Sequence, residues 1–205
     1  MENSWHLEDV TEIAKESPYT FYLPSETVIR KIVPGNIVKL MFSCDIENEQ
    51  GWTAERMWVI VTEIQDGVFK GTLDNDPSYI PDLKYQDIIQ FQSIHIMQTD
   101  IDDTTPNIVE KYNGRCCVTS QVLNEGFPVH QLYWKQPEED EENYSGWTLT
   151  SGHESDEYLN VSDNWYFVSL GAVLNKCDRF ISLLELQDVD HEFVWDEASL
   201  EYKKI

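Results

Sequence analysis

Residues 56–76 read RMWVIVTEIQDGVFKGTLDND, and this stretch decides the fold of the first half of the chain. The part before Gln65 is rich in β-branched and aromatic residues, a composition typical of a β-strand. Asp66-Gly67 is a strong hairpin signal, because both residues tolerate the positive φ that a two-residue turn requires. The sequence therefore predicts two antiparallel strands joined by a tight turn.

Similar β signals lie on both sides of this hairpin. They are PYTFYLP (18–24), GNIVKLMFSC (35–44) and IIQFQSIHIM (88–97). A short amphipathic helix is expected around Leu7 to Lys15, ended by Ser17-Pro18. We expect residues 1–98 to form a mostly antiparallel β unit, either a small barrel or a curled sheet.

A polar, acidic segment that contains a proline follows at residues 99–107 and predicts a linker. Residues 108–205 then mix strand and helix signals. The expected strands are RCCVTSQVL (115–123), FPVHQLYWKQ (127–136), GWTLTSG (146–152) and NWYFVSL (164–170). A helix is expected from Leu170 to Leu186, and residues 190–204 should add one more strand or a short helix. The predicted fold class is α+β with two small domains, the second an antiparallel sheet with a packed helix.

The charge of the chain is strongly acidic. Its 205 residues include 38 Asp and Glu against 14 Lys and Arg, a formal net charge of -24. Residues 1–106 and 107–205 each contain 7 basic and 19 acidic residues, so the charge is spread evenly. Such a field disfavours binding to nucleic acid or to an anionic membrane and accelerates association with a basic protein. With no signal peptide and no membrane span, a cytoplasmic protein is expected.

A run of consecutive acidic residues lies in the segment 137–159, PEEDEENYSGWTLTSGHESDEYL. Five consecutive acids there run into an aromatic and glycine cluster between two predicted strands. An acid run can be a solvated loop that contacts nothing, or a rim that steers a basic partner. We expect the partner-binding residues to be Glu138, Glu139, Asp140, Glu141, Glu142, Trp134, Trp147, Asp156 and Glu157.

Catalytic and metal sites have weaker support. Adjacent Cys116 and Cys117 lie in a predicted strand without a basic neighbourhood beyond Arg115, so core filling is the simpler interpretation. The chain contains no calcium loop, no H-E-x-x-H and no glycine-rich phosphate loop. Its seven tryptophans permit a carbohydrate-binding face, but most should be core. We expect no catalytic residue, no metal and no cofactor.

Residues 115–186 resemble the thirty-third numbered immunity-protein family of bacterial polymorphic toxin systems. The motifs that carry the resemblance are Gly126-x-Pro128-Val129, Tyr133, Ser145-Gly146-Trp147, Ser151-Gly152 and Tyr158. Trp134-Lys135 departs from the family, which more often has an Arg-Glu pair at this point. The preceding unit is similar to an uncharacterised bacterial domain family with the patterns R-M-W-V, G-x-L-x-N-x-P, D-L-K and D-x-I-x-F.

The resemblance implies a cytoplasmic inhibitor that binds a delivered protein toxin and blocks it stoichiometrically, without being an enzyme. The acids then imply a toxin with a basic surface. Two alternatives remain open at this point. One is a metal-assisted or cysteine hydrolase with an interdomain site, and the other is a regulatory or scaffold module whose partner is not a toxin.

Overall fold

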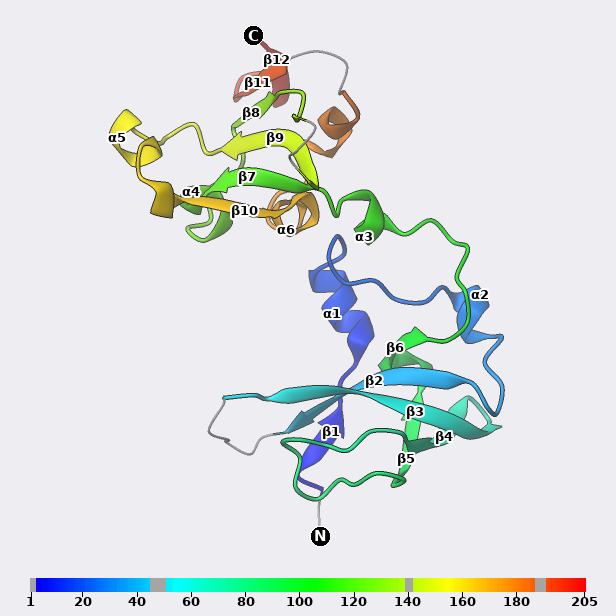
Figure 1. Cartoon of the computed structure of the whole chain (residues 1–205). Coiled ribbons are helices and arrows are strands. Elements are labelled where there is room, and N and C mark those ends of the chain that lie inside the picture. Colours follow the sequence, from blue (N-terminus) through cyan, green and yellow to red (C-terminus); the bar gives the residue numbers. More distant parts are fainter. Residues whose placement is uncertain (1–2, 45–50, 139–141, 187–190) are drawn as a thin grey trace. The chain divides into compact units, whose positions relative to one another are not determined.

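The computed structural model describes residues 3–44, 51–138, 142–186 and 191–205, and the chain forms two compact units (Figure 1). Unit 1 consists of residues 1–16 and 21–106, and unit 2 of residues 17–20 and 107–205. Each unit has its own sheet and its own hydrophobic core. The predicted α+β class, with a barrel-like first sheet and helices beside the second sheet, is confirmed.

Unit 1 is a nearly closed antiparallel barrel. Its strands are β1 (Trp5–Leu7), β2 (Ile37–Cys44), β3 (Ala54–Gln65), β4 (Val68–Leu73), β5 (Ile88–Gln92) and β6 (Ile96–Thr99). They are ordered β1-β2-β3-β4-β5, and β6 returns to pair with β2. The predicted hairpin joins β3 to β4 with φ of 50° at Asp66 and 79° at Gly67.

The unit 1 core follows from strand alternation. Val38, Leu40 and Phe42 of β2 are fully buried, because every second side chain points to the inside of the barrel. The described residues of the unit also include three short helices. They are α1 (Val10–Glu16), α2 (Glu26–Ile29) and η1 (Ser93–His95). The helix expected from Leu7 begins only at Val10, since Leu7 is paired with Phe42 in the sheet.

The segment that leads into α2 is fixed by one carboxylate. Asp103 accepts hydrogen bonds from the Tyr22 hydroxyl at 2.7 Å and from the Ser25 amide at 2.7 Å. The Thr105 amide also donates to it, at 2.9 Å. These donors, the Tyr22 hydroxyl first among them, hold the pKa of Asp103 far below its ordinary value.

Unit 2 contains one mixed sheet. Its strands are β7 (Arg115–Thr119), β8 (Gln131–Trp134), β9 (Tyr144–Thr150), β10 (Trp165–Ser169), β11 (His191–Asp196) and β12 (Glu201–Lys204). They are ordered β10-β7-β9-β8-β11-β12. The β9 strand lies between β7 and β8. It pairs antiparallel with β8 and parallel with β7. The expected last strand is in fact the antiparallel hairpin β11–β12.

The unit 2 helices are short. They are α3 (Ile108–Lys111), α4 (Ser120–Leu123), α5 (Asp156–Leu159), η2 (Ser162–Asn164), α6 (Leu170–Leu174) and η3 (Ile181–Glu185). The helix expected over residues 170–186 is therefore wrong in length, because α6 ends at Leu174 and Asn175 is its C-cap residue. The Asn175 side chain accepts from the Tyr19 amide at 3.0 Å and donates to the Thr20 hydroxyl at 2.7 Å.

Residues 17–20 belong to unit 2 through these bonds and through ring packing. The Tyr19 ring meets the Tyr112 ring edge-on, with centroids 5.9 Å apart. Gly171 lies so close to the Tyr19 carbonyl that a Cβ there would overlap it. The strand predicted over residues 18–24 does not form: residues 18–20 are a turn packed on α6, and residues 21–24 belong to neither a helix nor a strand. Within the described part of the chain, no helix has the length and apolar character needed to cross a membrane.

Candidate partner-binding surface

The sheet of unit 2 has one covered face and one open face. Side chains of β7, β8 and β9 such as Val118, Leu132 and Leu149 pack with α6 and η3 in the core and are fully buried. The residues between them point to the opposite face. We call this opposite face the open face of the sheet.

One row of residues crosses the open face from strand to strand. Tyr133 of β8 is opposite Thr148 of β9, Thr148 is opposite Cys117 of β7, and Cys117 is opposite Phe167 of β10. Tyr133 is 39% exposed and Phe167 is 44% exposed. We call Tyr133, Thr148, Cys117 and Phe167 the outer row. Large aromatic rings at both ends of a flat surface are the groups that anchor protein partners most often.

Two further groups border the outer row. The Tyr144 ring lies 5.8 Å from the Phe167 ring, and the Arg115 guanidinium lies 5.4 Å from the centre of the same ring. A shallow hollow of about 240 Å³ opens beside Tyr133. It is lined by Gln131, Tyr133, Thr148, Thr150, Gly152, Glu154, Leu159 and Trp165. Trp165 is held by its Nε1, which donates to the Leu159 carbonyl at 2.9 Å.

The predicted acids lie at two ends of this face. Glu138 and Glu142 belong to the loop between β8 and β9, while Glu139, Asp140 and Glu141 lie outside the described residues. Asp156 and Glu157 begin α5, beyond the other end of β9. Since β9 has seven residues, the two acidic groups are separated by roughly 20 Å of strand. The sequence placed these acids in one segment, and the fold sets them at opposite ends of the open face.

Glu154 and Glu157 stay charged for different reasons. Burial raises the pKa of Glu154, but donors to its carboxylate outweigh that effect and leave the pKa below its ordinary value. These donors are the Thr119 hydroxyl at 2.6 Å and the Ser151 amide at 2.8 Å. The pKa of Glu157 is lowered first by its own backbone amide and then by Ser155. Glu154 thus holds the loop after β9, whereas Glu157 is exposed to solvent.

Trp134 and Trp147, which the sequence assigned to the partner surface, lie instead in the core. Trp134 is 3% exposed and Trp147 is fully buried, and the two are opposite each other on the covered face. The Trp134 Nε1 donates to the Ser145 carbonyl at 2.9 Å. Alternation along β8 places Tyr133 outward and Trp134 inward. Tyr133 and Phe167 are exposed aromatic residues of the open face, and the sequence prediction of partner-binding residues named neither.

Gly146 explains why the Ser-Gly-Trp motif has its sequence. Its φ is +83°, and a Cβ there would overlap the Lys135 carbonyl and lie 2.6 Å from Trp134 Nε1. The Ser145 hydroxyl donates to the Arg115 carbonyl at 2.7 Å, which ties β9 to β7. The motif therefore seats Trp134 and fixes the base of the acidic loop.

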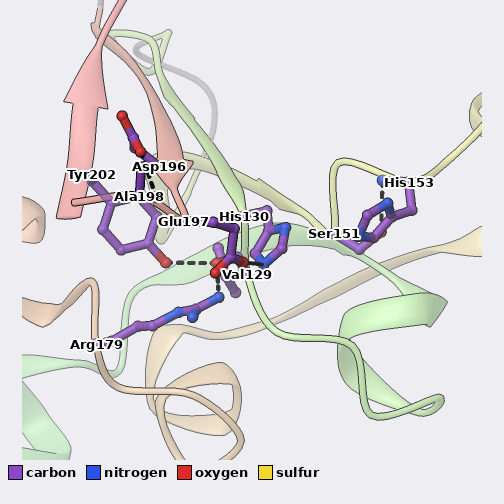
Figure 2. A network of polar contacts seen from close by, with 9 residues as sticks. All are labelled: Val129, His130, Ser151, His153, Arg179, Asp196, Glu197, Ala198 and Tyr202. Carbon is purple, nitrogen blue, oxygen red and sulfur yellow. Dashed lines mark hydrogen bonds and ion pairs between the residues drawn. The ribbon is translucent and has the colours of Figure 1, made fainter. Parts of the chain in front are cut away.

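A second polar cluster lies at the start of β8, as Figure 2 shows. The Val129 carbonyl accepts from the Tyr202 hydroxyl at 2.6 Å and from the Arg179 guanidinium at 3.0 Å. Arg179 also lies 4.1 Å above the Trp195 ring. Burial raises the pKa of Tyr202 to about 12, so its hydroxyl stays a donor. This cluster joins the β11–β12 hairpin to the segment before β8 within unit 2. No pattern in the sequence indicated it.

The serine and histidine side chains near this cluster are engaged in structural contacts. His130 and His153 have ring centroids 5.4 Å apart, and burial followed by the Arg179 charge lowers the pKa of His130. The nearby Ser151 hydroxyl is buried and donates to Gln121 at 2.6 Å. Cys116 is fully buried, and burial raises its pKa to about 12, which leaves the thiol protonated. Among the described residues, no three His, Cys, Asp or Glu side chains converge to hold a metal ion.

Comparison with known families adds two matches. Residues 116–205 match the family described as Immunity protein Imm33 domain. Residues 6–127 match the family described as Uncharacterized protein conserved in bacteria (DUF2314). The order and position of both matches confirm the resemblances inferred from the motifs. No curated protein sequence and no solved structure matches the chain.

Proposed function

Because the chain belongs to the family described as Uncharacterized protein conserved in bacteria (DUF2314) and also matches the Immunity protein Imm33 domain over residues 116–205, we propose that it neutralises a bacterial protein toxin by binding it. The immunity-domain match supports an immunity-protein role. The proposal adds a mechanism, in which the protein covers the toxin stoichiometrically in the cytoplasm and does no chemistry on it.

The observation that carries the mechanism is the open face of the unit 2 sheet. The outer row offers two exposed aromatic rings, Tyr133 and Phe167, on a rigid platform of paired strands. Aromatic side chains lose little conformational entropy on binding and bury a large area, so they make suitable anchors. Desolvation of these rings would set the lifetime of the complex.

The acids at the two ends of β9 would set the rate of association. A basic toxin is drawn toward a chain with a net charge of -24, and the acids Glu138, Glu142, Asp156 and Glu157 lie in the segments before and after β9. Charge at the rim of an interface acts mainly on the association rate and its salt dependence. If the toxin acts on an anionic substrate, the same acids would compete with that substrate.

The test needs a secreted toxin, to be sought among the genes beside that of this protein, and it measures association rates by stopped-flow fluorescence from about 20 mM to about 500 mM salt. The double substitution Glu138→Lys with Glu142→Lys should lower the association rate at low salt by about tenfold and flatten its salt dependence. The control is Glu110→Lys with Glu185→Lys, which changes the net charge equally on α3 and η3. An association rate that is unchanged, or lowered equally by the control, would refute the steering role.

A second pair of substitutions tests the anchors. Tyr133→Ala with Phe167→Ala should raise the dissociation rate by roughly thirtyfold or more, which corresponds to the 2 kcal/mol or more that a hot-spot residue contributes. The association rate should change little. If the variant pair dissociates like the parent protein, the open face is not the contact surface. If the parent protein does not bind the neighbouring toxin, the immunity mechanism itself fails.

A further inference from the structure

The β10 strand is an unprotected edge of the unit 2 sheet. It is terminal in the strand order, and its sequence WYFVS carries no charge. Tyr166 is 39% exposed and Phe167 is 44% exposed. The opposite edge, β12, has the sequence EYKK, with charges of the kind that keep edge strands from pairing. The contrast between the two edges singles out β10 as a pairing edge.

The hydrogen bonds of β10 show which backbone groups point away from the sheet. The Leu170 amide donates to the Gly114 carbonyl at 2.8 Å, so Leu170 and every second residue before it face β7. The amides and carbonyls of Trp165, Phe167 and Ser169 therefore point outward. Two of these groups are already used, since the Trp165 amide donates to the Ser162 carbonyl and the Ser169 carbonyl starts α6.

The remaining outward amides and carbonyls of one strand match those of a second, antiparallel copy of the same strand. They are the amides of Phe167 and Ser169 and the carbonyls of Trp165 and Phe167. In an antiparallel pair centred on Phe167, each Phe167 amide meets the Phe167 carbonyl of the other strand. Each Ser169 amide meets the other strand's Trp165 carbonyl. We propose that two copies of this chain associate through β10 in this arrangement, which joins their unit 2 sheets into one continuous sheet.

One existing contact must give way in this pairing. Arg115 donates to the Phe167 carbonyl at 3.4 Å, a long hydrogen bond that a backbone amide can replace at shorter distance. The guanidinium keeps its position over the Phe167 ring. The exchange leaves no buried group without a partner.

Charge favours a second copy over a basic partner at this edge. Two chains of net charge -24 repel each other over most of their surfaces, and an uncharged strand is where that repulsion is least. A basic segment would gain nothing from an edge without acids. The dimer should therefore tighten as salt is added, because screening removes the repulsion. Toxin binding has the opposite salt dependence.

The experiment measures the mass of the protein alone by sedimentation velocity, over a range of protein concentrations and from low to high salt. The expected result is a concentration-dependent shift from the 24.0 kDa monomer to twice that mass, stronger at high salt. Phe167→Lys should weaken the dimer by roughly tenfold or more, because it places two lysines at the centre of the pair. Phe127→Lys is the matched control, since Phe127 is 39% exposed and lies outside the strands.

A second measurement needs no substitution. Hydrogen exchange of the unmodified protein should slow at the Phe167 and Ser169 amides as its concentration rises, while the exposed β12 amides stay unchanged. A protein that remains monomeric at high salt and high concentration overturns the proposal. A dimer that Phe167→Lys and Phe127→Lys weaken equally, or that leaves β10 exchange unchanged, overturns it as well. Neither measurement involves a toxin, so the outcome is independent of the immunity mechanism.

Discussion

Gly146→Ala should destabilise unit 2, because Gly146 is part of the Ser-Gly-Trp motif that packs against Trp134. Two costs are expected. A left-handed φ, here +83°, costs an alanine roughly 1–2 kcal/mol. The new Cβ would also overlap the Lys135 carbonyl and press on Trp134 Nε1, and overpacking of this kind typically costs about 1–3 kcal/mol. The sum is a loss of roughly 2–5 kcal/mol in the free energy of unfolding.

Gly126→Ala isolates the first cost. Gly126 has nearly the same φ, +80°, but no atom lies within 4 Å of its would-be Cβ. Both substitutions reduce the entropy of the unfolded chain equally, so this effect cancels in the comparison. The difference between the two variants should therefore equal the steric term alone, about 1–3 kcal/mol.

The assay is urea unfolding, with the unit 2 transition identified by hydrogen exchange of peptides from β8 and β9, because both units contain tryptophan. For a unit of this size, each 1 kcal/mol corresponds to a shift of roughly 4–8 °C in melting temperature, which gives an independent measure. If Gly146→Ala is no more destabilising than Gly126→Ala, then the contact of Gly146 with Trp134 does not hold the motif, and the reasoning is wrong.

Three further predictions concern stability and reactivity. The pKa of Asp103 is lower in the folded state than its unfolded value near 3.9, so its stabilisation is present above that pH and is lost as pH falls. Asp103→Asn should therefore flatten the acid dependence of unit 1 unfolding below about pH 4, and an unchanged pH profile would contradict this assignment. Cys116, with its raised pKa, should resist iodoacetamide at about pH 8 in the native protein and react in urea, as read by mass spectrometry; native labelling at the rate of a free thiol would contradict its burial. Gly171→Ala should displace Tyr19 and make residues 17–20 sensitive to limited proteolysis, and equal protection in the variant would show that the close approach is not needed.

Strand positions were predictable where one side chain in two is buried. Residues 37–44 and 54–65 have this pattern, and Asp66-Gly67 supplies the turn between the second strand and the next. Strand alternation puts Tyr133 and Trp134 on opposite faces, and Trp134, which the sequence assigned to the partner surface, is in fact buried. Which of the two faces inward depends on the Ser145 carbonyl, which receives the Trp134 Nε1 from the neighbouring strand. Alternation is local information, whereas the identity of the covered face is not.

Other features required contacts between distant residues. The apolar stripe after Leu170 is compatible with a long helix, yet α6 ends at Leu174, and the side chain of the following Asn175 bonds to residues 19 and 20. The β9 strand pairs in parallel with β7, although β8 comes between them in the sequence. No local pattern in the sequence encodes this pairing. For the same reason the acids of residues 137–159 were predicted as one group, although the length of β9 separates them.

The assignment of residues 17–20 to unit 2 has a consequence for synthesis on the ribosome. The Tyr19 hydroxyl donates to Asp178, 159 residues further along the chain, at 3.1 Å. At about 5–20 residues per second, that partner leaves the ribosome roughly 8–30 seconds after Tyr19 does. During this interval the strands of unit 1 on both sides of the loop can already pair, and the loop must stay accessible until α6 forms. The first residues of unit 2 to be made are thus among the last to be ordered, and a pause in translation before Asn175 would prolong the exposure of Tyr19.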